Sequence, residues 1–103
     1  MLDSVLLHID KNQKRWLENL ISFLSIPSIS AQPDHDADTQ QAAGWLRYYL
    51  AGIGMEARLV PTARQRAVLA TTPDNLCPPG APHVVFYGHY DVQPAEPLDL
   101  WTT

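Results

Sequence analysis

Apolar residues near the start of the chain recur at three- and four-residue spacing, with polar residues between them. This period places an apolar stripe along one side of a helix, so the sequence predicts an amphipathic helix from about Asp3 to Ser25. Pro27 ends this helix, because the residue before a proline is pushed out of helical geometry. Residues 25–38, SIPSISAQPDHDAD, have no period and predict a loop. The stripe consists of Leu2, Val5, Leu6, Ile9, Leu17, Leu20, Ile21 and Leu24.

A second helical pattern begins near Asp36 or Asp38, either of which can cap a helix through its side-chain oxygen. Apolar residues then continue at helical spacing from Ala42 to Ile53. Gly52 and Gly54 supply the stop, because glycine readily adopts the backbone conformation that ends a helix. The sequence therefore predicts a second helix directly after the loop.

The rest of the chain predicts strands. Residues 55–60 (MEARLV) and 66–71 (RAVLAT) are short β-prone runs, which indicate two neighbouring strands with a hairpin as one arrangement. The prolines of residues 72–82 exclude a central strand or a helix interior there. Residues 83–88 (HVVFYG) form a continuous apolar run, which predicts a strand covered on both faces. This order predicts an α/β fold, with two N-terminal helices packed on a mixed sheet of about three strands.

The composition narrows the functional classes. A chain of 103 residues with 46% hydrophobic content suits one small domain. The net charge of -4, without a basic run, argues against nucleic-acid binding. Cys77 has no partner cysteine in the chain, which favours a reducing compartment. The sequence contains neither a signal-peptide pattern nor an apolar stretch of ~20 residues, so we expect a cytoplasmic protein without a membrane partner.

His89 and Asp91 offer the clearest chemistry, because they directly follow the predicted buried strand. In open α/β sheets, ligands bind beyond the carboxyl ends of strands. If the backbone stays extended, the two-residue period places both side chains on the same side. A carboxylate there can accept the N–H of an imidazole whose other nitrogen binds a metal. The same spacing also fits an ordinary hydrogen bond at the end of a strand.

The surrounding sequence resembles a known family. Residues 87–94 (YGHYDVQP), followed by EPLDLWTT, resemble the first metal-binding motif of the M20 family of zinc aminoacylases, carboxypeptidases and dipeptidases, especially its dipeptidase-like branch. FLSIPSIS (23–30) and AAGWLRYYLAGIGMEARLV (42–60) resemble the opening of the same family's catalytic domain. The resemblance covers essentially the whole chain, so residues 1–103 are interpreted as the N-terminal portion of one M20-type catalytic domain.

The resemblance implies roles for both residues: His89 is a ligand of one zinc ion, and Asp91 orients that ligand. Family sites hold two zinc ions and hydrolyse an amide bond of a dipeptide or an acyl-amino acid with metal-activated water and a general-base glutamate. The other metal ligands, the glutamate and the lid or dimerisation domain lie downstream of Thr103 in family members. Because catalytic zinc normally has three protein ligands, we expect an incomplete domain that is inactive alone and binds zinc at most weakly.

Other interpretations concern the whole chain and two smaller motifs. The alternative for the whole chain is a stand-alone, non-catalytic α/β interaction module, or a remnant of such an enzyme, which binds a partner through exposed apolar surface.

Residues 34–38 (DHDAD) alternate carboxylates as a calcium loop does, but Thr39 stands where the turn glycine belongs, so a helix-capping loop is favoured. His83 lies roughly 20 Å from His89 at strand rise, too far to share a metal.

Overall fold

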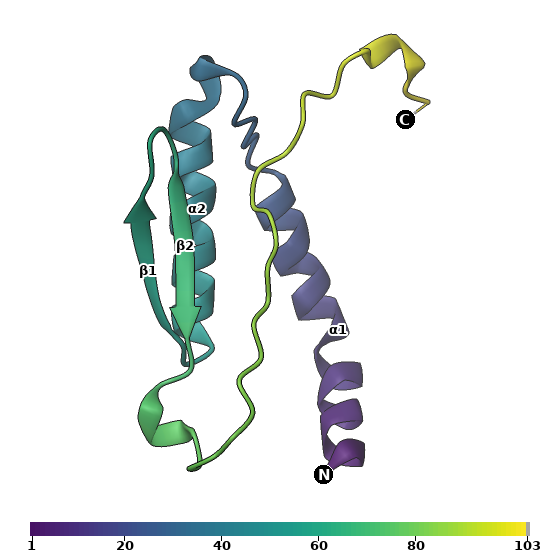
Figure 1. The fold of residues 1–103 in the computed structure, drawn as a ribbon. Coiled ribbons are helices and arrows are strands. Elements are labelled where there is room, and N and C mark those ends of the chain that lie inside the picture. The colour runs from purple at the N-terminus through teal and green to yellow at the C-terminus, as the bar shows by residue number, and fades with distance from the viewer. Residues whose placement is uncertain (103) are drawn as a thin grey trace.

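The computed structural model describes residues 1–102 as two helices, a β-hairpin and a long extended segment (Figure 1). The helices are α1 (Leu2–Leu24) and α2 (Asp36–Gly52), and the strands are β1 (Glu56–Pro61) and β2 (Arg66–Thr71). Single 3-10 turns lie at Pro33–His35, Asp74–Leu76 and Leu98–Leu100. The predicted order of two helices and then two strands is confirmed, and so is the α/β class. No helix in the described part of the chain is long and apolar enough to cross a membrane.

α1 follows the predicted boundaries closely but is covered along little of its length. It ends at Leu24, where Ser25 donates its backbone N–H to the carbonyl of Ile21 at 2.9 Å. None of its residues is buried, and the apolar stripe is exposed. Near its C-terminal end, the Phe23 ring stacks on Trp45 of α2, with ring centroids 4.9 Å apart. This aromatic contact is a main link between the two helices.

α2 packs on both strands of the hairpin. β1 and β2 are antiparallel, with Glu56 opposite Thr71 and Pro61 opposite Arg66, so the hairpin arrangement is confirmed. Before β1, Gly54 adopts a φ of 94°, which a glycine tolerates and which ends the helix. The buried core is small and consists of Ile26, Ser28, Thr39, Ala42 and Ala43.

The first turn of α2 differs in one respect from the prediction. The helix begins at Asp36 with His35 in the capping position, and neither Asp36 nor Asp38 caps it through a side chain. Asp36 Oδ1 instead accepts hydrogen bonds from Arg64 at 3.0 Å and Gln65 at 2.8 Å, which tie the helix to the hairpin turn. Both carboxylates still lie in the first turn, where the positive end of the helix dipole stabilises negative charge.

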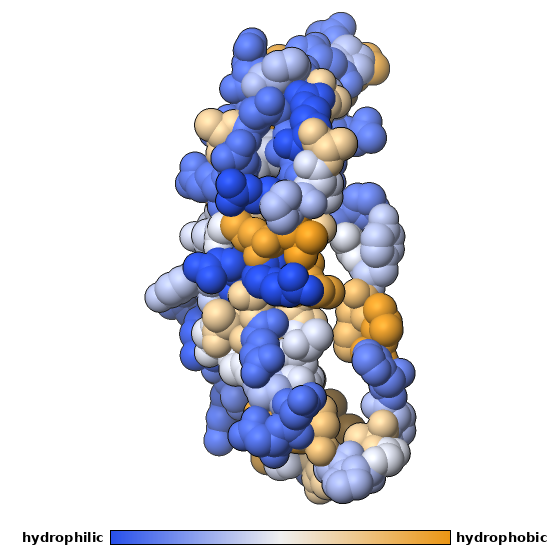
Figure 2. Space-filling model, turned by 60° about the vertical axis from the view of Figure 1, so that its left-hand side comes forward, coloured by the Kyte–Doolittle hydropathy of each residue, from blue (hydrophilic) through white to orange (hydrophobic). Residues whose placement is uncertain are grey.

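The predicted third strand at residues 83–88 is wrong, and the sheet has two strands instead of three. These residues are extended but form no ladder, and among the described residues their backbone makes no hydrogen bond to another segment. Val85, Phe86 and Tyr87 are 80%, 93% and 87% exposed. Figure 2 shows this arm standing apart from the body of the molecule, with apolar groups on its surface.

Residues 83–88 lie across an open space from β2. At the end of the segment, the Tyr90 hydroxyl donates to the carbonyl of Arg66, the first residue of β2, at 2.5 Å. At Arg66, the backbone of β2 and the backbone of the extended segment are therefore separated by the length of a tyrosine side chain plus one hydrogen bond. The backbones of paired strands are only about 4.8 Å apart. The space between them is a cavity of about 1160 Å³, lined by β2 and by residues 80–91. An apolar run becomes a buried strand only when a neighbouring strand and covering layers are in place, and the described residues supply neither here.

Candidate functional site

His89 and Asp91 lie within the extended segment, next to Val92, whose backbone N–H binds the loop after α1. Figure 1 shows the extended segment passing close to this loop. Their side chains point to the same side, as the two-residue period predicts, and His89 Nδ1 lies 3.4 Å from Asp91 Oδ1. The His89 side chain is 70% exposed and that of Asp91 is 38% exposed. The pair is therefore open to a ligand from solvent.

The second imidazole nitrogen of His89 faces Tyr87. The Tyr87 hydroxyl lies 3.3 Å from His89 Nε2, and the two rings meet edge to face at a centroid distance of 5.4 Å. Nδ1 lies beside a carboxylate that can accept a proton, and Nε2 lies next to a hydroxyl that can donate or accept one, so a tautomer with its proton on Nδ1 gives both nitrogens a partner. In that tautomer the lone pair of Nε2, which a metal ion would bind, faces the Tyr87 hydroxyl.

The loop of residues 28–30 fixes the position of residues 90–92. The backbone N–H of Val92 donates to the Ser28 carbonyl at 2.9 Å, and the Ser28 hydroxyl donates to the Tyr90 carbonyl at 3.0 Å. Ser28 is 2% exposed, so both contacts lie away from water. Two segments about sixty residues apart in sequence are thereby joined at the candidate site.

Ser30 makes the side-chain contact of this junction. Its hydroxyl donates to Asp91 Oδ2 at 2.6 Å, so one carboxylate oxygen binds Ser30 and the other faces His89. The prediction from sequence did not single out Ser30 as a site residue. The available signal was the resemblance of FLSIPSIS to the opening of the M20 catalytic domain, which gave the segment a family context but no contact.

Two groups at the site have perturbed pKa values. The hydrogen bond from Ser30 is the main cause that lowers the pKa of Asp91, and the nearby His89 lowers it further. Burial is the main cause that raises the pKa of the Tyr90 hydroxyl, and the negative charge of Asp91 raises it further. Asp91 is thus held as a carboxylate, which is the form that accepts an N–H from an imidazole.

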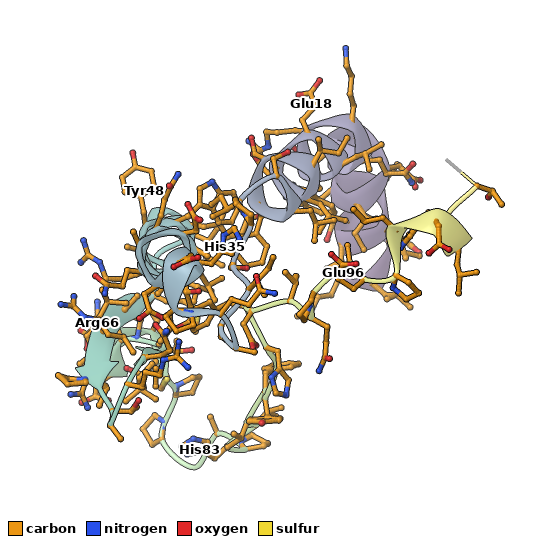
Figure 3. The ribbon with its side chains drawn as sticks, turned by 90° about the horizontal axis from the view of Figure 1, so that it is seen from above. Glu18, His35, Tyr48, Arg66, His83 and Glu96 are labelled. Carbon is orange, nitrogen blue, oxygen red and sulfur yellow. The ribbon has the colours of Figure 1, made fainter. Side chains whose placement is uncertain are left out.

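The other histidines lie elsewhere. Figure 3 shows His83 on the open loop, well apart from His35 beside α2. His35 Nδ1 lies 2.7 Å from Asp38 Oδ2, so its ring is engaged at the start of α2. Within residues 1–102, no three His, Cys, Asp or Glu side chains are grouped so that they could hold a metal ion. His89 and Asp91 thus lie together as a pair, with Nδ1 and Oδ1 3.4 Å apart.

Comparison with known proteins supports a dipeptidase-like relationship. The chain is 28% identical over 96 residues to the cysteinylglycine-S-conjugate dipeptidase of Corynebacterium striatum. The alignment covers 92% of this chain and 20% of that protein, so the chain spans about a fifth of the length of this relative. No protein-family profile matches the sequence, and no solved structure matches it.

Proposed function

We propose that this chain is the N-terminal part of an M20-type, metal-dependent hydrolase that cleaves the amide bond of a dipeptide or of an acyl-amino acid. The observation that carries the proposal is the linked arrangement of Ser30, Asp91 and His89, in which the carboxylate binds the serine and faces Nδ1 of the imidazole. The similarity to a dipeptidase along almost the whole chain supports the class of substrate.

Each residue of the pair has a defined part in this proposal. His89 presents Nε2 as a ligand to zinc, and Asp91 accepts the Nδ1 proton, which fixes the ring and makes Nε2 more basic. A bound pair of zinc ions would supply activated water and polarise the scissile carbonyl. The resemblance to the M20 family assigns one zinc ligand to this chain, and catalytic zinc normally has three protein ligands. We therefore propose that the isolated chain does not hydrolyse the substrate by itself.

A chimera tests the proposal directly. The aligned region of the Corynebacterium striatum dipeptidase is replaced by this chain, and hydrolysis of a cysteinylglycine S-conjugate is measured after chelation and after Zn²⁺ is added back. We expect zinc-dependent hydrolysis that His89→Ala abolishes. His83→Ala is the matched control, because His83 is an exposed histidine of the same extended segment, and it should leave the activity unchanged.

Two results would contradict the proposal. One is a folded chimera that shows no hydrolysis under conditions in which the parent dipeptidase is active. The other is an active chimera that keeps its activity after His89→Ala. If the chimera does not fold, the aligned region of the parent dipeptidase is removed and this chain is supplied as a separate polypeptide, with the same two histidine variants compared.

A further inference from the structure

We propose that Ser30 is a positioning residue, which holds the Asp91 carboxylate in the orientation that directs His89. This inference rests on the proposed function and deepens it, because it assigns a role to a residue outside the His89–Asp91 pair. Ser30 lies in the loop after α1, 61 positions before Asp91 in sequence, and its hydroxyl donates to Oδ2 at 2.6 Å.

The two carboxylate oxygens of Asp91 have separate partners. Oδ2 accepts the Ser30 hydroxyl, and Oδ1 lies 3.4 Å from His89 Nδ1. A carboxylate that is free to rotate about its terminal bond samples a broad range of angles, because that torsion has no sharp minima. A short bond to one oxygen limits this rotation and keeps the other oxygen facing the imidazole.

The surroundings of Asp91 make this restraint necessary. Residues 83–88 before it are exposed and make no ladder, and Tyr87, the one among them that contacts the His89 ring, is itself 87% exposed. Ser28 contacts backbone atoms of Tyr90 and Val92, which fixes the path of the chain but not the carboxylate. Ser30 is the neighbouring residue whose side chain reaches the carboxylate itself. Within this loop, Ser28 therefore fixes the backbone of residues 90–92, and Ser30 fixes the side chain of Asp91.

The first measurement is the tautomer of His89, read from its imidazole ¹⁵N chemical shifts in the full chain at about pH 8. The unmodified chain should carry its proton on Nδ1, and Ser30→Ala should shift the population toward the Nε2–H form. Ser30→Thr, which keeps the hydroxyl, should restore the original population. Ser25→Ala is the control, because the Ser25 hydroxyl also makes a hydrogen bond, to the Ile21 carbonyl at 2.7 Å, but away from this site.

The second measurement is a Zn²⁺ titration followed at the His89 resonances. Loss of a residue that orients a metal ligand typically lowers metal affinity about 10–100-fold, so Asp91→Ala should fall in this range. Because Ser30 acts one contact further from the ligand, Ser30→Ala should lower the affinity by about three- to tenfold. Ser30→Thr should again recover the original affinity.

The inference is overturned if a folded Ser30→Ala chain keeps both the His89 tautomer and the Zn²⁺ affinity. If Ser30→Ala does not fold, the same comparison is made between Ser30→Thr and Ser30→Val, which have similar shapes and differ in the hydroxyl, and equal tautomer populations would overturn it. The tautomer does not depend on catalysis. A tautomer shift together with an inactive chimera would thus retain the role of Ser30 and reject the proposed function.

Discussion

Removing the Ser28 hydroxyl should loosen the junction between the loop after α1 and the candidate site. Ser28→Ala deletes the hydrogen bond to the Tyr90 carbonyl, which is 3.0 Å long and made by a residue that is 2% exposed. A typical hydrogen bond contributes about 0.5–1.5 kcal/mol net to stability, and each 1.36 kcal/mol corresponds to roughly a tenfold change in an equilibrium. The junction should therefore open about two- to thirteenfold more often in the variant.

The backbone amide of Val92 reports this opening, because it donates to the Ser28 carbonyl at 2.9 Å and must be released before it can exchange. Hydrogen exchange followed by NMR should show Val92 exchanging faster in Ser28→Ala by the factor given above, with amides in the middle of α2 unchanged. Ser25→Ala serves as the matched control and should leave Val92 unaffected. Equal Val92 exchange rates in the Ser28→Ala chain and the unmodified chain would refute the idea that this contact holds the two segments together.

Four further predictions concern the rest of the molecule. The amides of residues 83–88 should exchange at rates close to those of an unfolded chain, because they make no backbone hydrogen bond to another described segment; strong protection would show that a strand forms in solution. The Ser30 hydroxyl lowers the pKa of Asp91 in the folded chain. The ionised carboxylate should therefore stabilise the junction fully at a pH above the ordinary aspartate pKa of about 3.9. This stabilisation should disappear as the pH falls through the lower pKa that Asp91 has in the folded chain. Asp91→Asn should remove that part of the pH dependence, as monitored by Val92 exchange. Trp45→Ala breaks the stack between the helices and should lower the free energy of unfolding by about 2–4 kcal/mol, measured by urea denaturation, since the ring is partly buried and stacked on two others. Calorimetry on the isolated chain should show weak Zn²⁺ binding at His89, and tight stoichiometric binding would contradict the single-ligand interpretation.

The helices and the hairpin could be predicted because their signals are local. The apolar stripe before Pro27 and the helical spacing after Asp36 place both helices within a few residues of their observed bounds. The two β-prone runs flank a short polar turn, in which the Thr62 N–H donates to the Gln65 carbonyl at 3.0 Å. Residues that are close in sequence determine each of these elements, so the sequence pattern is sufficient to find them.

The prediction for residues 83–88 was wrong because a buried strand is not a local structure. HVVFYG has the composition of a central strand, but the strand forms only if another strand hydrogen-bonds to it and other elements cover its faces. In the structure Tyr90 reaches across to Arg66, and the segment stays apart from β2. The apolar pattern therefore describes the composition of the segment, but the structure does not give it the environment of a buried strand.

The sequence by itself determined the two helices, the hairpin and the spacing that places His89 and Asp91 on the same side of an extended chain. The tertiary structure alone decided that Ser28 and Ser30 dock against this pair, because contacts between segments about sixty residues apart depend on how the intervening helix and hairpin fold back. It also decided that the apolar residues before His89 remain exposed. Residues that are close in sequence determine the local periodicity of a helix or strand. The residues that contact a carboxylate or pair with a strand edge depend on how the whole chain folds.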